Sequence, residues 1–374
     1  RGEQRDHAVA RGRGGEGREG ITCGFTTGDQ SRDSTASFFD YHRNYLQQLI
    51  AIFPKDVLAG RAKALLADSS VTQMSSSFMV AYDFLYDDST VTVRSLDELS
   101  GTYYASGIGE LYARSSWDQD ATWVNMIAGP YTESHAHQDQ GALMIYKGGW
   151  LAYDPVVHSS SGLNQDTTSH GLVRIDQGGT PVRQIGSTMS NLLALHMGDG
   201  WVHASADLTP AYNGNAAVHK VHRELVYLKP DVIVVFDRVA TASGTTQTWQ
   251  LAAPVAPSIN GNTATISNAG HSLQVTRVAP SAGSMSTYSY ASQSDFSGGH
   301  RLDLQQPGGD NRYLHVLAVD QAATSITAAG PTGVSVTSGG RVATVTFNRD
   351  SVGGTLVIDG TSIALGAGVD SLPE

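Results

Sequence analysis

Residues 232–239, VIVVFDRV, and residues 341–360, RVATVTFNRDSVGGTLVIDG, decide the class of fold of this chain. Both are rich in β-branched residues, and a cluster of Asn, Arg, Asp, Ser and Gly divides the second stretch into two apolar runs. This composition is typical of β-strands joined by turns. Similar runs follow one another from Thr102 onward, which predicts an antiparallel β domain over residues 102–374. Because this length exceeds that of one simple sandwich, we expect two stacked large sheets or a double sandwich.

Before residue 102, the apolar residues follow a different spacing. Apolar residues recur at three- and four-residue spacing in residues 37–53, and similar patterns follow Pro54 in residues 55–67 and 75–86. This spacing predicts about three helices. We interpret residues 40–49, DYHRNYLQQL, as an amphipathic helix whose polar side chains face solvent. The expected organisation is therefore a helical segment with its linker over residues 35–101, in which residues 87–101 connect the two halves.

Charge and cysteine content exclude some classes of function. The chain of 374 residues has 24 Lys and Arg against 35 Asp and Glu, a formal net charge of −11. This excess of negative charge gives no general attraction to nucleic acid or to an anionic membrane. Cys23 is the only cysteine, which excludes an intramolecular disulfide. The sequence contains no run of 18 apolar residues, so it predicts no membrane span. Residues 1–34, poor in large apolar side chains, are expected to be a disordered or processed N-terminal segment.

The densest group of titratable residues is found in residues 133–155, ESHAHQDQGALMIYKGGWLAYDP. His135 and His137 are two positions apart, so they point to the same side of an extended chain. Asp154 and His170 follow. Two imidazoles and a carboxylate with one open position are a common zinc arrangement. The alternative is a set of ordinary, hydrogen-bonded histidines.

The turn between the two apolar runs of this stretch limits the geometry. If Gly148 and Gly149 form a two-residue turn, Asp154 lies across from Leu143 and not from His137. The segment HAHQDQ must then bend, or the turn must be longer.

Three stretches together resemble the heparinase II/III-like polysaccharide lyases. They are residues 112–155 (YARSSWDQDATWVNMIAGPYTESHAHQDQGALMIYKGGWLAYDP), residues 167–175 (TTSHGLVRI) and residues 211–239 (AYNGNAAVHKVHRELVYLKPDVIVVFDRV). In that family an α/α toroid of many helices precedes an antiparallel β-sandwich domain. The resemblance therefore implies an α+β multidomain protein with a short, truncated toroid-like helical segment. A catalytic Tyr and a His or Asn of the toroid are not recognised in this chain.

The resemblance also implies roles for individual residues. His135 corresponds to a histidine that faces the substrate, whereas His137, Asp154 and His170 correspond to a structural zinc site near the active site. Tyr212 resembles a tyrosine that reaches toward the sugar, although a packed aromatic ring is the alternative. Arg114 is expected to pair with a uronate carboxylate or else to hold the domain interface. Glu133 and Gln138 are expected to contact the substrate, and these two residues and Asp139 are the candidates that orient the ligating imidazoles.

The function that the resemblance implies is cleavage of a uronic-acid-containing acidic polysaccharide by β-elimination. A uronyl C5-epimerase and a non-catalytic carbohydrate-binding β-sandwich are the alternatives. The expected partner is an acidic polysaccharide or oligosaccharide, with neither nucleic acid nor membrane, and homo-oligomer formation stays open. The expected location is secreted or periplasmic, with no signal visible in this chain.

Overall fold

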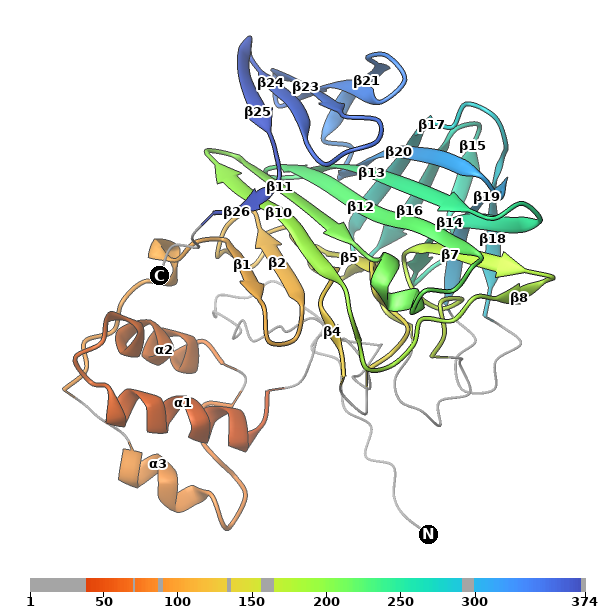
Figure 1. The fold of residues 1–374 in the computed structure, drawn as a ribbon. Helices are drawn as coiled ribbons and strands as arrows, with labels where there is room; N and C mark the ends of the chain where they lie inside the picture. Colours follow the sequence, from red (N-terminus) through yellow and green to blue (C-terminus); the bar gives the residue numbers. More distant parts are fainter. Residues whose placement is uncertain are drawn as a thin grey trace. The chain divides into compact units, whose positions relative to one another are not determined.

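The structure is a computed structural model, and it describes residues 38–69, 71–86, 90–132, 136–155, 165–290 and 299–370 (Figure 1). These residues divide into two compact units, a helical unit over residues 38–99 and a β unit over residues 100–370. The predicted N-terminal segment, residues 1–34, lies outside the described residues, as do Glu133 and His135. None of the described helices has the length and apolar character that a bilayer span requires.

The helical unit contains three α-helices, as the apolar spacing predicts. Its elements are α1 (Asp40–Ile52), α2 (Val57–Ala67), α3 (Val80–Tyr86) and the 3-10 helix η1 (Leu96–Glu98). The helical pattern is interrupted at Pro54. Asp56 caps the next helix, α2, because its Oδ1 accepts a hydrogen bond from the backbone N–H of Leu58 at 2.8 Å. Ile50, Ala59, Leu66 and Val91 form the small core of this unit.

The burial of α1 differs from the prediction. Its polar residues Asn44 and Gln47 are buried, whereas Tyr41 and Tyr45 are exposed. The reason is Asp83 on α3, which accepts a hydrogen bond from Gln47 Nε2 at 2.8 Å. This hydrogen bond offsets part of the desolvation cost of the buried Gln47 amide. The interpretation of these polar side chains as a solvent-facing surface is therefore wrong for Asn44 and Gln47.

The β unit is built around a nine-stranded central sheet. In spatial order it contains β15 (Ser258–Asn260), β16 (Thr263–Asn268), β17 (His271–Ala279), β20 (Asp310–Val319), β13 (Val232–Thr241), β12 (Val218–Leu228), β11 (Trp201–Asp207), β10 (Asn191–Gly198) and β26 (Gly368–Val369). Its ladders are antiparallel, apart from the short parallel pair of β10 and β26.

Three five-stranded sheets complete the unit. The first sheet contains β1 (Thr102–Ala105), β2 (Glu110–Arg114), β3 (Trp123–Ile127), β5 (Leu143–Tyr146) and β6 (Trp150–Ala152). The second sheet contains β18 (Met285–Ser289), β19 (His300–Pro307), β14 (Thr245–Ala253), β7 (Val173–Gln177) and β8 (Thr180–Pro181). The C-terminal sheet contains β21 (Ala323–Ala328), β22 (Gly333–Ser338), β23 (Arg341–Phe347), β24 (Gly354–Ile358) and β25 (Thr361–Leu365). Two further strands, β4 (Pro130–Tyr131) and β9 (Thr188–Met189), pair with each other, and the 3-10 helix η2 covers Thr209–Tyr212.

Both faces of the central sheet are buried, which explains the unbroken apolar run of β13. Ile233 and Val235 belong to the core that the central sheet shares with the first and second sheets. Val234 and Phe236 belong to the core shared with the C-terminal sheet. Because successive side chains of a strand point to opposite faces, the part of β13 that lies between the two cores, residues 232–236, is apolar at every position. The predicted antiparallel β-sandwich architecture is confirmed.

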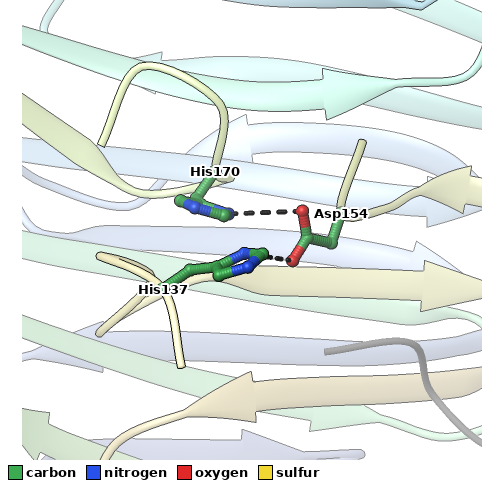
Figure 2. Close-up of side chains that lie close together, drawn as sticks. All are labelled: His137, Asp154 and His170. Atoms are coloured by element: carbon green, nitrogen blue, oxygen red, sulfur yellow. Dashed lines mark ion pairs between the residues drawn. The ribbon is translucent and has the colours of Figure 1, made fainter. Parts of the chain in front are cut away.

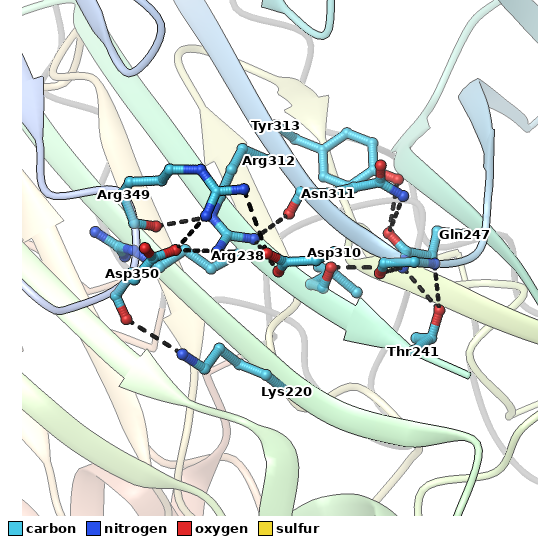
Figure 3. A network of polar contacts seen from close by, with 12 residues as sticks. Lys220, Arg238, Thr241, Gln247, Asp310, Asn311, Arg312, Tyr313, Arg349 and Asp350 are labelled. Atoms are coloured by element: carbon cyan, nitrogen blue, oxygen red, sulfur yellow. Dashed lines mark hydrogen bonds and ion pairs between the residues drawn. The ribbon is translucent and has the colours of Figure 1, made fainter. Parts of the chain in front are cut away.

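A network of polar contacts attaches the C-terminal sheet to the central one (Figure 3). The buried guanidinium of Arg238 on β13 donates a hydrogen bond to Asn348 O at 2.7 Å, just after β23. Arg312 on β20 pairs with Asp350 at 2.6 Å, and Lys220 on β12 donates to the carbonyl of the same residue. Three adjacent strands thus hold one connection of the C-terminal sheet.

Candidate metal centre and its surroundings

Three segments of the β unit bring the predicted ligands together. His137 lies in the loop between β4 and β5, Asp154 follows the end of β6, and His170 lies in the turn before β7. The β5–β6 ladder pairs Ile145 with Ala152 and ends there. The segment before β5 bends through a turn in which Ala142 N–H donates to Asp139 O at 2.7 Å. This bend between His137 and β5 is one of the two alternatives that the predicted register left open.

The two imidazoles and the carboxylate form a compact group (Figure 2). His137 Nδ1 lies 3.8 Å and His170 Nδ1 3.4 Å from the two oxygens of Asp154, and the potential ligand atoms all lie within 4.8 Å of one another. All three residues are buried, His137 completely. Four-coordinate zinc takes nitrogen and oxygen ligands at about 2.0–2.2 Å, so two ligand atoms of one ion lie at most about 4.4 Å apart. The separations of 3.8 and 3.4 Å are within this limit. The donor set and its geometry therefore fit a divalent metal.

Each imidazole has a distinct environment. His137 Nε2 lies 3.0 Å from the side-chain amide of Gln165, which orients the ring. Among the described residues, His170 Nδ1, the ring nitrogen nearest Asp154, makes no hydrogen bond. A buried polar atom without a partner costs free energy. The ring of His170 is therefore better explained by a site that binds a cation than by a site that stays empty. Gln165 was not predicted from the sequence, since it lies 28 residues from His137 along the chain.

The charges around the group are mainly negative. Burial alone would lower the pKa of His170, but the carboxylates of Asp154, Asp139 and Asp166 outweigh it and raise that pKa. Burial, opposed in part by His170 and reinforced by Asp154 and Glu110, raises the pKa of Asp139 to about 7. A cluster of buried carboxylates of this kind favours a positive charge at its centre.

The other predicted site residues are less closely grouped. Glu133 and His135 lie outside the described residues. Tyr212 is buried in the main core, and its burial, although opposed by Gln184 and Arg223, raises its pKa to about 12. Gln138 is also buried, and its Oε1 accepts a hydrogen bond from the backbone N–H of Gln184 at 3.0 Å. Tyr212 and Gln138 thus pack inside the protein in this conformation, and their roles stay predictions.

Arg114 occupies a defined position at the end of β2. Its guanidinium lies over the rings of Trp117 and Trp123, with its Cζ atom 4.3 and 4.2 Å from their centroids. Stacking on two indoles holds the plane of the guanidinium in one orientation. Its predicted pairing with a uronate stays a prediction.

One buried ion pair, which sequence reasoning missed, joins the two histidine segments. Arg223 on β12 pairs with Asp237 on β13 at 2.7 Å. The Nη1 atom of Arg223 donates hydrogen bonds to Gly141 O at 2.5 Å and to Gly171 O at 2.7 Å. A side chain at Gly171 would approach Leu143 O to 2.9 Å, which explains why this position is glycine. Arg223 is one of several charged residues in residues 211–239, so the sequence pattern does not single it out.

Comparison with solved structures identifies the class of fold. No family model and no curated protein matches the chain. The chain shares its fold with about half of the length of the solved structures of a heparan sulfate lyase and of heparinase III, so the predicted resemblance is confirmed at the level of the fold.

The individual likenesses are as follows. Heparan sulfate lyase HepC from Pedobacter heparinus has a TM-score of 0.60 and 15% identity, over 90% of this chain and 50% of that one. The heparinase III BT4657 gene product has a TM-score of 0.58 and 14% identity, over 91% and 49%. A further heparinase III has a TM-score of 0.57 and 13% identity, over 91% and 52%. The chain thus spans about half the length of the solved structures that it matches.

Proposed function

We propose that the protein is a polysaccharide lyase that cleaves a uronic-acid-containing acidic polysaccharide or oligosaccharide by β-elimination. The observation that carries this proposal is the buried group of His137, Asp154 and His170 within a fold shared with heparan sulfate lyases. One fold serves many reactions, so the site and not the fold must support the chemistry. A charged polysaccharide does not cross a lipid bilayer, and a secreted or periplasmic location is therefore part of the proposal.

The proposed metal is zinc, held by His137, Asp154 and His170 with a fourth position for water or a substrate atom. The ion would supply a fixed positive charge that offsets the nearby carboxylates and ties together the three segments that carry its ligands. We assign it a structural role, because the side chains of the chain can themselves carry the proton transfers.

Elimination from a uronide makes three demands. The substrate carboxylate must be neutralised, a base must take the C5 proton, and the C4–O bond must break as the C4=C5 double bond forms. The departing oxygen then takes up a proton. The largest demand is to stabilise the negative charge that develops on the carboxylate, which fixed donors do best.

Five residues are proposed for these roles. His135 acts as neutraliser or base, because an imidazole that holds no metal titrates near neutral pH. Tyr212 provides the proton for the leaving oxygen, which requires that its buried hydroxyl becomes accessible. Arg114, with its guanidinium held flat by two indoles, meets the uronate carboxylate. Glu133 and Gln138 contact the sugar or orient the site.

The test is an ultraviolet assay for the unsaturated product with alginate, heparan sulfate, chondroitin sulfate and hyaluronan, run in parallel in deuterated water. An increase in absorbance with at least one substrate is the expected result. Deuterium at C5 without absorbance would instead identify a C5-epimerase. Binding without either signal would identify a carbohydrate-binding module. The epimerase result and the binding-only result would each contradict the lyase proposal.

Two neighbouring histidines give a matched pair of variants. His135→Ala is expected to retain zinc and unfolding temperature but to lose about 10²-fold or more in rate, the usual scale for a general acid or base. His137→Ala is expected to lose zinc and stability together, because it removes a ligand. Zinc content by elemental analysis and thermal unfolding separate the two roles. A His135→Ala variant with the full elimination rate would remove His135 from the mechanism.

A further inference from the structure

The turn that carries His170 is buried although it has no regular secondary structure. Thr167, Ser169 and His170 are each no more than 1% exposed. Buried backbone carbonyls without strand or helix partners must find other hydrogen-bond donors. Side chains from other segments of the β unit supply several of these donors. The backbone N–H groups of Leu172 and Leu143 also donate, to His170 O and Gly171 O respectively.

Gln250 on β14 provides two of these hydrogen bonds. Its Nε2 donates to His170 O at 2.7 Å and also to Thr167 O. The opposite end of the amide is fixed, because Gln250 Oε1 accepts a hydrogen bond from Arg174 Nη1 at 3.1 Å. Arg174 is itself paired with Asp176 at 2.9 Å. The amide therefore has one orientation, with its NH₂ group directed at the turn.

Arg301 on β19 and Tyr290, which follows β18, bind the carbonyl of Thr168, which lies between Thr167 and His170 in the sequence. Arg301 Nη1 donates to Thr168 O at 2.5 Å, and the hydroxyl of Tyr290 donates to the same oxygen at 3.1 Å. Asp303 fixes the guanidinium of Arg301 through contacts at 2.5 and 2.7 Å. Together with Arg223 at Gly171 O, buried side chains thus satisfy the carbonyls of residues 167, 168, 170 and 171.

We propose that Gln250 is a positioning residue that holds the His170 turn in the metal-binding conformation before any metal is present. The inference rests on the metal site of the proposed function. Gln250 binds the carbonyl of His170 itself and that of Thr167, so it fixes the backbone on both sides of Ser169. A ligand that is already in place loses little conformational freedom on binding, which increases metal affinity. Residues that orient ligands in this way typically change metal affinity about 10–100-fold when replaced.

The chain contains a matched control for Gln250. Gln247 lies on the same strand, is equally buried, and donates from Nε2 to Thr241 Oγ1 and to Gly309 O, each at 2.8 Å. None of these partners belongs to the His170 turn. Gln250→Met and Gln247→Met therefore each remove a buried, hydrogen-bonded amide, but only the first removes contacts to the turn that carries His170.

The first experiment measures zinc affinity of the full chain by competition with a chromogenic chelator. Gln250→Met is expected to bind zinc about 10–100-fold more weakly than the unmodified chain. Gln247→Met is expected to keep the unmodified affinity despite a comparable fall in unfolding temperature. The absorption spectrum of the cobalt-loaded protein should change in Gln250→Met alone, because the ligand geometry changes. Equal affinities and spectra in both variants would overturn the proposal.

The second experiment needs no metal. Hydrogen exchange of residues 165–172 in chelator-treated protein is expected to be faster in Gln250→Met and unchanged in Gln247→Met. If the unmodified chain binds no zinc, the metal part of the proposed function fails, while this exchange still decides whether Gln250 holds the turn. Unchanged exchange in Gln250→Met would overturn the inference itself.

A gentler variant covers the case in which Gln250→Met does not fold. Tyr290→Phe removes one hydroxyl and its hydrogen bond to Thr168 O, with little change in volume. We expect about a threefold to tenfold loss of zinc affinity, together with faster exchange of the turn. A variant that matches the unmodified chain in both measurements would contradict the role given to these contacts.

Discussion

At the scale of single residues, His315 on β20 is a buried imidazole in an unfavourable environment. Its ring stacks on Trp249 with 3.8 Å between centroids. Among the described residues, neither of its ring nitrogens has a hydrogen-bond partner. Burial lowers the pKa of His315 to about 3, and the positive charges of Arg223 and Arg277 act in the same direction. His315 is therefore neutral in the folded protein at any pH near neutrality.

This environment predicts a specific loss of stability in acid. An unfolded histidine has a pKa of about 6.5, so below that pH the unfolded chain takes up a proton that the folded chain does not. The contribution of His315 is thus complete above about pH 6.5 and decreases as the pH falls toward 3. The largest slope it can give is about 1.4 kcal/mol per pH unit.

The test compares His315→Phe, which keeps a ring against Trp249 but cannot titrate, with the unmodified chain. We expect urea unfolding between pH 6.5 and 4 to show a smaller pH slope in the variant, and His219→Gln, at an exposed position, to keep the original slope. Identical slopes in His315→Phe and the unmodified chain would show that His315 does not carry this effect.

At the scale of elements, the contact between β13 and β23 joins the central and C-terminal sheets. Phe236 and Phe347 stack with their centroids 5.0 Å apart and their planes 5° from parallel. Both rings are nearly inaccessible to solvent. The apolar run of β13 predicts burial of Phe236, but the strand pattern alone does not say which strand covers it.

Replacing one of these rings should destabilise the β unit. Phe347→Ala is expected to lower the free energy of unfolding by about 3–5 kcal/mol, because it removes a buried ring and leaves a cavity. Phe347→Leu should cost less, because it leaves a smaller cavity. The neighbouring Thr346→Ala, at an exposed position of β23, should stay within about 0.5 kcal/mol. Urea unfolding measures all three, and equal effects of Phe347→Ala and Thr346→Ala would contradict the packing described.

At the scale of the whole β unit, the central sheet depends on the C-terminal sheet to cover one of its faces. Val226, Val234, Leu314 and Val316 belong to the core that the two sheets share. The chain then returns to the central sheet, where β26 pairs with β10. The C-terminal sheet is therefore attached to the central sheet through the shared apolar core and through the pairing of β26 with β10.

Deletion of residues 322–374 tests this dependence. It would expose a large apolar face of β12, β13 and β20, and faces of this kind promote association. We expect the shortened chain to bind a hydrophobic dye and to elute as an oligomer or aggregate, in contrast to the full chain at the same concentration. A monomeric shortened chain with the original unfolding temperature would show that the C-terminal sheet is an independent addition.

Much of this organisation could be predicted from the sequence, because strands and helices leave local patterns. The apolar spacing of residues 37–86 predicts the helices, and the β-branched runs from Thr102 onward predict the strands. The histidine-rich stretch marks the candidate site, but the pattern alone left His135 and His137 as equal candidates for a ligand. The family resemblance, and not the spacing, separated them.

The sequence by itself determined the helix-to-strand change and the residue types of the candidate metal site. Only the tertiary structure decided which residues hold that site together. Gln250 lies 80 residues from His170, and Arg223 lies 52 residues from Gly171 and 82 from Gly141. No local pattern encodes such contacts, because period and composition reflect the exposure of a segment and not its partner. Buried carbonyls in an irregular turn take donors from whichever strands packing brings beside them, and that packing is a property of the folded chain.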